Sequence, residues 1–211
     1  MKKLLLLCLI CWYSVTIVEA SKSYSNKLPK CKITTSTIND YEPEEFQLSN
    51  NLLRKTGQQA KYCATKIIVS GTVLDQNCVP VPDAKVYLWQ VGCDGKYPYV
   101  PLRTRIDKKR INPTTKSTFT GSGTATTDNN GNFYFITVYP GRIPHEVANL
   151  NVRVEHRELG QLQTKLYLSN KAKSYKNCGE ISPALHKILD ETRIYEFKIV
   201  IPGKTLKKLQ Y

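Results

Sequence analysis

The chain lacks the short motifs that mark several common enzyme classes. Its 211 residues include three histidines, but there is no H-E-x-x-H pair, no G-x-S-x-G elbow and no P-loop. Those motifs supply zinc ligands, a serine nucleophile and a phosphate cradle, respectively. Their absence argues against a zinc metalloprotease, a serine hydrolase and a P-loop NTPase of the usual kinds.

Long hydrophobic runs are also scarce, because a single one lies at the N-terminus and no second one follows. Lys2 and Lys3 precede an almost wholly apolar stretch, residues 4–18, and Ala20 is a small residue. This order is typical of a secretory signal peptide, and the run is short for a membrane span. We predict a signal peptide at residues 1–20 and a soluble mature protein that is secreted or periplasmic. The alternative is an uncleaved membrane anchor.

Beyond the predicted signal peptide there is no C-x-x-C pair, which excludes zinc-ribbon and redox signatures of that type there. Five cysteines remain beyond residue 20, with spacings of 32, 15, 15 and 85 residues: Cys31, Cys63, Cys78, Cys93 and Cys178. In an oxidising compartment we expect one or two disulfides among them. The odd number leaves one thiol free or intermolecular, and the sequence leaves the connectivity open.

Acidic residues are few, since 17 Asp and Glu stand against 31 Lys and Arg, which gives a net charge of +14 at pH 7. The predicted signal peptide carries two lysines and one glutamate, so its removal lowers this charge from +14 to +13. A basic protein is attracted to anionic partners such as an envelope surface. The basic residues are scattered, with small clusters at residues 108–110 and 207–208, and no nucleic-acid-binding motif accompanies them. We therefore expect no specific nucleic acid as a partner.

From residue 65 onward the pattern is that of short strands separated by turns. Apolar or alternating runs predict strands at residues 65–75, 84–91, 119–128, 131–141, 148–156, 160–169 and 193–203. Asn130-Gly131 is a strong hairpin signal between two of these strands, and residues 100–118 form a long basic loop. Short helices are expected near residues 44–53 and at 184–190. The fold class is all-β: an antiparallel β-sandwich with short peripheral helices.

This pattern divides the chain after the signal peptide into three parts. Residues 21–62 form an N-terminal extension whose role the sequence leaves open, residues 63–203 form the sandwich, and residues 204–211 form a basic tail. The 191 residues beyond residue 20 suffice for one domain with a real core plus extensions.

One predicted strand, within PHEVANLNVRVEH, has an unexplained polar face. Leu150, Val152 and Val154 alternate with the polar residues Asn149, Asn151, Arg153 and Glu155. That is the period of a strand with one buried apolar side. The two asparagines either face water or look into a site.

Three blocks of the sequence resemble the intradiol ring-cleavage dioxygenases. The first is VSGTVLDQNCVPVPDAKVYLWQVGCDGKYPY, the second FTGSGTATTDNNGNFYFITVYPGRIP and the third GQLQTKLYL. The first two blocks alone would also fit transthyretin-like or carboxypeptidase-regulatory sandwiches, which carry no metal. Trp89-Gln90, the P-G-x-x-P turn and the T-x-L-Y block favour the dioxygenases. The resemblance implies a β-sandwich that cleaves catechols with a ferric iron held by two tyrosinates and two histidines.

The positions that the resemblance assigns to this site carry other residues here. Ile143 stands for one tyrosine, and Asn149 and Asn151 stand for the two histidines of an H-I-H strand. Glu146 takes the place of an arginine that helps to stabilise the substrate. The other tyrosine lies in a loop too divergent to align, where counting leads near Ile111, and residues 100–118 contain no tyrosine.

A displaced ligand set is the alternative to a lost one. His145 together with Tyr97, Tyr99 or Tyr139 offers substitute ligands, whereas His156 has the opposite strand parity to Asn149 and Asn151. Asparagine is a neutral oxygen ligand, better suited to Ca²⁺ than to Fe(III), and two of them without carboxylates make a weak metal site. We expect no cofactor, or Fe(III) if the family activity is retained.

Two functions remain open. The chain is either a secreted, catalytically degenerate member of the family that acts as a binding or envelope-associated module, or an active Fe(III) intradiol dioxygenase with a displaced ligand set. An unrelated transthyretin-like carrier or adhesin module is a more remote reading. A small aromatic ligand and an anionic envelope surface are the expected partners, and homo-oligomerisation is open. If the alignment is correct, Ile143, Asn149 and Asn151 converge on a small cavity at one end of the sandwich.

Overall fold

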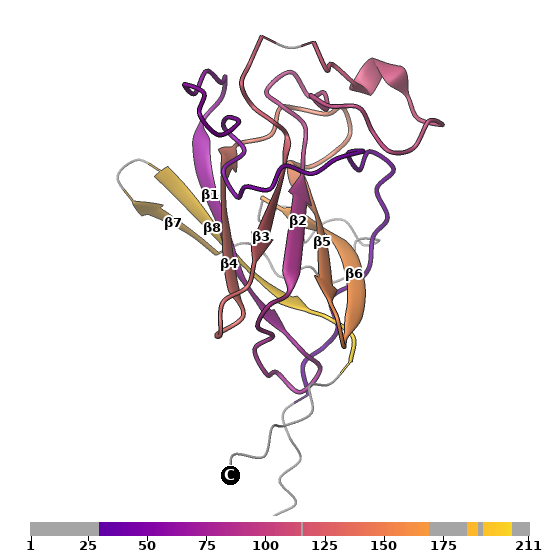
Figure 1. Cartoon of the computed structure of the whole chain (residues 1–211), viewed down its shortest axis with the longest axis vertical. Coiled ribbons are helices and arrows are strands. Elements are labelled where there is room, and N and C mark those ends of the chain that lie inside the picture. Colours follow the sequence, from indigo (N-terminus) through magenta and orange to yellow (C-terminus); the bar gives the residue numbers. More distant parts are fainter. Residues whose placement is uncertain (1–29, 115, 169–184, 190–191, 204–211) are drawn as a thin grey trace, which may run out of the picture.

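A computed structural model describes residues 30–114, 116–168, 185–189 and 192–203. The predicted signal peptide, the tail at 204–211 and Cys178 lie outside these residues. Two four-stranded sheets face each other, as the sequence predicted for an all-β sandwich (Figure 1). The strands are β1 (Lys66–Leu74), β2 (Lys85–Trp89), β3 (Ser122–Thr126), β4 (Asn132–Val138), β5 (Asn149–His156), β6 (Gly160–Tyr167), β7 (Leu185–Leu189) and β8 (Thr192–Val200).

The first sheet has the strand order β4-β1-β8-β7. β1 pairs antiparallel with β4 and parallel with β8, so the last strand of the described chain lies beside the first. Alternation in β1 turns Ile67, Val69 and Val73 inward, where all three are buried. This apolar row forms one wall of the core.

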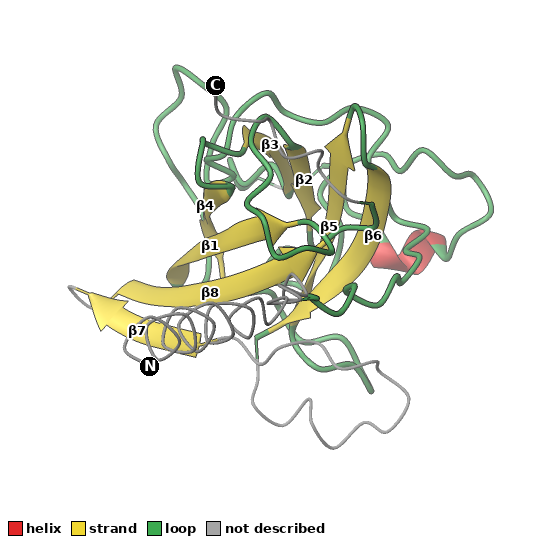
Figure 2. Cartoon of the chain, turned by 90° about the horizontal axis from the view of Figure 1, so that it is seen from below, coloured by secondary structure: helices red, strands yellow, loops and turns green. Residues whose placement is uncertain are grey.

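The second sheet has the order β3-β2-β5-β6, all antiparallel (Figure 2). Leu150, Val152 and Val154 of β5 are buried and belong to the main core cluster. The opposite face of β5 is therefore the outer face of this sheet, and it carries Asn149 and Asn151. Burying one apolar side of each sheet against the other is what drives the two sheets together.

The Asn130-Gly131 turn is present, but the hairpin predicted from it is wrong. Asp128 Oδ1 accepts hydrogen bonds from the backbone N–H groups of Asn130 and Asn132, and Gly131 has a φ of +72°. These bonds, that from Asn132 first, lower the pKa of the Asp128 carboxyl. β3 pairs with β2, however, and β4 pairs with β1. The turn carries the chain from one sheet to the other, because each strand finds its ladder partner in a different sheet.

Both predicted helices are wrong. Residues 44–53 are irregular, and their backbone groups bond to other segments: Leu52 N–H donates to Ile136 O, and Ile136 N–H donates to Asn50 O. Residues 185–189 form β7, which pairs with β8. Partners distant in sequence thus override the local helical period in both places. Among the described residues helical structure is confined to a 3-10 turn, η1 (Lys108–Arg110), within the basic loop.

The described part of the N-terminal extension, residues 30–62, lies along the sandwich. Cys31 forms a disulfide with Cys78, Thr37 N–H donates to Gln163 O of β6, and Leu52 is fully buried in the core. A second disulfide joins Cys63 to Cys93. Two disulfides agree with the expectation of one or two. The extension is a packed part of the fold, and no helix in the described residues is long and apolar enough to cross a membrane.

Candidate functional site

The outer face of β5 is covered. Asn149 is 9% exposed and Asn151 is 1% exposed, so neither asparagine points into open water. Both lie near the start of β5, at the end of the sandwich where the 100–118 loop is found (Figure 1). Buried amides need hydrogen-bond partners, and the identity of those partners defines the site.

Asn151 is held between two aromatic residues of the first family-like block. Its Nδ2 donates to the backbone oxygen of Trp89 at 3.3 Å and to the Tyr97 hydroxyl at 3.5 Å. Its Oδ1 has no hydrogen-bond partner among the described residues. Trp89, Val91 and Tyr97 form a separate buried cluster against which Ile143 packs. Asn151 therefore contacts this cluster through the Trp89 backbone oxygen and the Tyr97 hydroxyl.

Asn149 and Ile143 line the same pocket, which has a volume of about 240 Å³. Val91 and Val147 supply apolar walls, and Glu146 contributes a carboxylate. Asn149 Nδ2 donates to Val147 O at 2.7 Å and lies 3.5 Å from Glu146 Oε2. The structure thus joins two of the three substituted ligand positions at one pocket, while Asn151 is not part of its lining.

Glu146 is surrounded by cations. Arg110 lies 3.1 Å from its Oε1, and Lys165 lies 3.9 Å from its Oε2. Arg110 comes from η1, so this ion pair ties the basic loop to the start of β5. Each oxygen of the Glu146 carboxylate therefore lies near a cationic side chain of the protein.

Tyr97, named above as a possible substitute ligand, is buried beside Asn151. Counting led near Ile111, and the structure pairs Ile111 with Tyr97 in an isolated β-bridge. Burial raises the pKa of the Tyr97 phenol above its usual value of 10.0, while hydrogen bonds from Asn39 and Asn151 and the charge of Arg110 oppose the shift only in part. Tyr97 is therefore a neutral phenol at neutral pH. The D-G-K-Y turn of the first block was the signal that could have placed it.

The other proposed substitute ligands do not meet at one point. His145 is exposed in a turn with a φ of +63°, and His156 Nδ1 accepts a hydrogen bond from Glu158 N–H at the far end of β5. The Tyr99 hydroxyl donates to Tyr41 O, and burial raises its pKa well above the usual value. Tyr139 lines the 240 Å³ pocket and packs near Tyr195.

These residues do not fit ferric iron. Fe(III) is stabilised by anionic phenolates and imidazoles, whereas Ile143 has no donor atom and Asn149 and Asn151 offer neutral amides. The described residues contain no group of three or more His, Cys, Asp or Glu side chains able to hold a metal ion. The side chains at these positions therefore do not support a ferric iron site.

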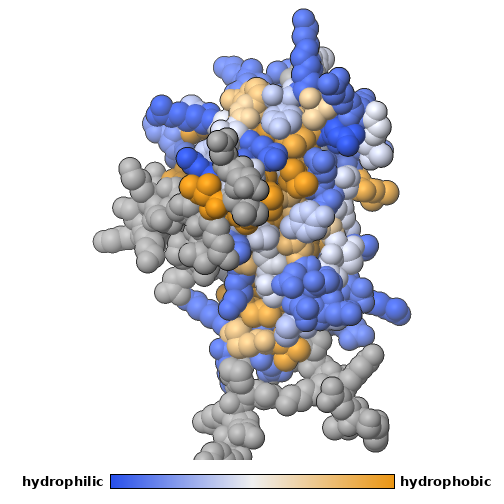
Figure 3. Space-filling model, turned by 90° about the vertical axis from the view of Figure 1, so that its left-hand side faces the viewer, coloured by the Kyte–Doolittle hydropathy of each residue, from blue (hydrophilic) through white to orange (hydrophobic). Residues whose placement is uncertain are grey.

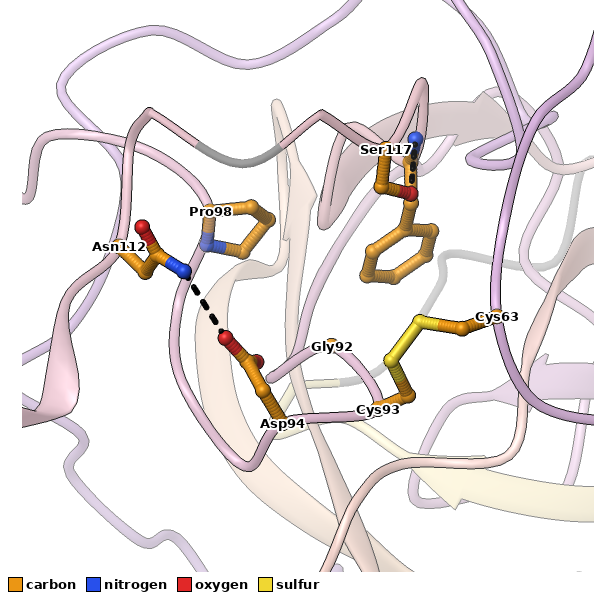
Figure 4. Close-up of a pocket in the computed structure, with 8 residues that line it drawn as sticks. Cys63, Gly92, Cys93, Asp94, Pro98, Asn112 and Ser117 are labelled. Carbon is orange, nitrogen blue, oxygen red and sulfur yellow. Dashed lines mark hydrogen bonds between the residues drawn. A yellow bond between two sulfur atoms is a disulfide. The ribbon is translucent and has the colours of Figure 1, made fainter.

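A second, smaller pocket, with a volume of about 90 Å³, has the Cys63–Cys93 disulfide in its lining (Figure 4). Asp94 accepts a hydrogen bond from Asn112 at its edge, and Phe119 forms its apolar side. The peptide N–H of Gly141 donates to Gly92 O, so the Cys93 turn packs against the turn that carries Ile143. The disulfide thus links residue 63 to the Cys93 turn, which in turn contacts the turn that carries Ile143.

The buried phenols predict a loss of stability at high pH. In the unfolded chain a tyrosine loses its proton near pH 10, but folded Tyr97 and Tyr99 have raised pKa values and keep theirs. The unfolded state then binds fewer protons than the folded state, so the free energy of unfolding falls as pH rises above about 10. The free energy of unfolding, measured with urea between about pH 9 and 11, should fall less steeply with pH for Tyr97→Phe than for Tyr134→Phe. Tyr134 is the control because its side chain is exposed. Equal slopes would contradict the assignment.

Comparison with known proteins agrees with this fold, a β-sandwich domain. A family model described as "Dioxygenase" matches residues 39–167. "Putative dioxygenase" of Rickettsia bellii (strain RML369-C) is 52% identical over 208 residues, which cover 99% of this chain and 100% of the relative. The protocatechuate 3,4-dioxygenase beta chain of Burkholderia cepacia is 28% identical over 99 residues, 46% of this chain and 38% of the relative. The chain belongs to the intradiol ring-cleavage dioxygenase superfamily.

Solved structures show the same fold. An intradiol ring-cleavage dioxygenase from Tetranychus urticae superposes with a TM-score of 0.63 at 18% identity, covering 85% of this chain and 98% of the other. The 3-chlorocatechol 1,2-dioxygenase from Rhodococcus opacus 1CP superposes with a TM-score of 0.58 at 19% identity, covering 81% and 73%. At these identities the likeness concerns the fold alone.

Proposed function

We propose that this chain is a secreted, catalytically degenerate intradiol dioxygenase-like protein that binds a small aromatic molecule in the 240 Å³ pocket. The observation that carries the proposal is the chemistry of the ligand positions: Ile143, Asn149 and Asn151 are uncharged, and Asn151 is hydrogen-bonded below Trp89 and Tyr97. These three positions therefore offer neutral side chains where the family resemblance places anionic or imidazole ligands. This favours binding over metal-dependent oxidation.

The pocket suits a single aromatic ring. Ligand sites combine apolar walls with a few fixed polar groups. Val91, Ile143 and Val147 supply the walls, and Asn149 and Glu146 lie among them. The volume is small for a drug-sized molecule and adequate for one ring. Because a relative is named a protocatechuate dioxygenase, a catechol is the first probe to try.

Export from the cytosol is supported by two features. The N-terminal run has the order of a signal peptide, and the two disulfides are of the kind that persists in oxidising compartments. Association with an anionic envelope surface is supported by exposed Arg105, Lys108 and Lys109 in the 100–118 loop. Hydrophilic side chains project from this end of the molecule (Figure 3).

The competing proposal is an active Fe(III) dioxygenase with displaced ligands. It requires a histidine beside the phenols, and His145 is the nearest in sequence, but that residue is exposed in a turn. We therefore rank this function second.

Metal content and binding measurements decide between the two proposals. The protein purified with added ferric iron should contain far less than stoichiometric iron, show no visible band with catechol and consume no oxygen, while calorimetry detects catechol binding. Val147→Phe, which fills the pocket, should weaken binding by about tenfold or more, an effect of about 1.4 kcal/mol. Val100→Phe, at a residue that is 57% exposed and outside the pocket, should leave it unchanged. Stoichiometric iron with a catechol-dependent band and oxygen uptake would overturn the proposal.

A further inference from the structure

The segment of residues 37–46 lies across the outer face of the second sheet. In Figure 1 it is the indigo chain that crosses in front of β2 and β5. It forms no strand within either sheet, yet it is tied down along its length. Glu42 forms an ion pair with Arg153 of β5, Leu102 N–H donates to Glu42 O, and Glu44 N–H donates to Val100 O. This segment, here called the strap, is the cover over Asn151.

Tyr41 is the part of the strap that lies against the site. Its ring stacks on the ring of Tyr97 with the centroids 4.7 Å apart and the planes 9° from parallel. The Arg110 guanidinium lies 4.7 Å from the Tyr41 centroid and 5.9 Å from that of Tyr97. Stacking between aromatic rings and a guanidinium near a ring face are both attractive interactions.

Asn39 links the strap to Trp89 and Tyr97 by hydrogen bonds. Its Oδ1 accepts from Trp89 Nε1 at 3.1 Å and from Tyr41 N–H at 2.8 Å, and its Nδ2 lies 3.4 Å from the Tyr97 hydroxyl. Below it, Asn151 Oδ1 is buried without a partner among the described residues. Tyr97 is 2% exposed. One face of its ring stacks on Tyr41, and its hydroxyl accepts hydrogen bonds from the amides of Asn39 and Asn151.

We infer that the Tyr97 face is a binding site for a planar phenol and that the chain fills it with its own Tyr41. The ligand class follows from the present occupant, because the site already accepts a phenol ring stacked in parallel beneath a guanidinium. Asn151, whose Nδ2 donates to the Tyr97 hydroxyl, also keeps its Oδ1 buried without a hydrogen-bond partner among the described residues. The strap is then a tethered competitor, and an external aryl ligand binds on Tyr97 only when Tyr41 leaves. This inference rests on the proposed function of aromatic binding and concerns a place outside the lining of the 240 Å³ pocket.

Phenol binding to strap variants tests the inference. Tyr41→Ala vacates the Tyr97 face, Tyr41→Phe keeps a ring there, and Phe46→Ala removes a ring from the same strap that packs on Tyr87 and Trp89 instead. By calorimetry, Tyr41→Ala should bind phenol on the order of tenfold more tightly than the other two variants and the unaltered chain. In the protein without residues 1–20 Trp89 is the remaining tryptophan, so its fluorescence reports ligand entry. Phenol should also raise the Tm of Tyr41→Ala but not that of Tyr41→Phe.

Each outcome bears on the inference. A cooperatively folded Tyr41→Ala that binds phenol no better than Phe46→Ala overturns it. If Tyr41→Ala does not fold, Tyr41→Leu is the substitute, because it removes the ring and keeps an apolar side chain. If Tyr41→Leu binds phenol no more tightly than the unaltered chain, the inference is overturned equally. Catechol binding that is lost in Val147→Phe but unchanged in Tyr41→Ala supports the proposed function and overturns this inference. Phenol binding that is gained in Tyr41→Ala, with no catechol binding by the unaltered chain, supports this inference and overturns the proposed function.

Discussion

Restoring three side chains is expected to create a ferric iron site. Ile143→Tyr, Asn149→His and Asn151→His together add one phenol and two imidazoles beside Tyr97, whose hydroxyl already lies 3.5 Å from the Asn151 side chain. Two phenols and two imidazoles form the ligand set that the family resemblance implies. We expect the triple variant to regain part of the iron binding and to become coloured, whereas the unaltered chain should do neither. Metal analysis and a visible spectrum measure this directly.

A fourth substitution checks that Tyr97 is the remaining ligand. Adding Tyr97→Phe to the triple variant removes one phenol oxygen and keeps the ring that packs on Tyr41. The colour should fade and iron should be lost on dialysis. Tyr99→Phe in the same background is the control, because the Tyr99 hydroxyl is engaged with Tyr41 O. A folded triple variant that stays free of iron would mean that the three positions do not converge as the alignment requires.

The second large effect concerns the core and comes from the N-terminal extension. Leu52 is 0% exposed and fits against Gly123 of β3, where a Cβ atom would lie 2.7 Å from Leu52 Cδ1. Leu52→Ala removes buried methyl groups and leaves a cavity, so it should lower the free energy of unfolding by about 2–5 kcal/mol. Urea or thermal unfolding gives the value.

The chain provides a matched control four residues away. Leu48 is 94% exposed, and Leu48→Ala should change the free energy of unfolding by less than about 0.5 kcal/mol. If both variants unfold alike, the extension is not part of the cooperative core. If only Leu52→Ala is destabilised, residues 30–62 fold together with the sandwich.

The strands were predictable where one local period was enough to define them. In β1 and β5 every second side chain is apolar and buried, so the sequence shows the strand and its inner face together. The errors arose where a local pattern competed with distant partners. Residues 185–189 carry a pattern compatible with a helix, but their backbone pairs with β8. The Asn130-Gly131 turn is local and correct, whereas the pairing of the strands that it connects depends on which sheet each one joins.

The candidate site was predictable in its residue types and not in its contacts. Aligning the family-like blocks identified Ile143, Asn149 and Asn151 from the sequence alone. Tyr97 could not be assigned beside them by counting, because the turn that bears it folds back from β2 onto the start of β5. The participation of Tyr41 gave no local signal, since its stacking partner lies far along the chain.

The sequence by itself determined the family and the apolar faces of the main strands, because both are encoded in residue type and short-range period. The tertiary structure alone decided that the polar face of β5 is covered by the strap and that Leu52 completes the core. The physical reason is the range of the interactions. The hydrogen bonds of Asn39 with Trp89 and Tyr97 span 50 and 58 residues, so no local sequence pattern encodes them.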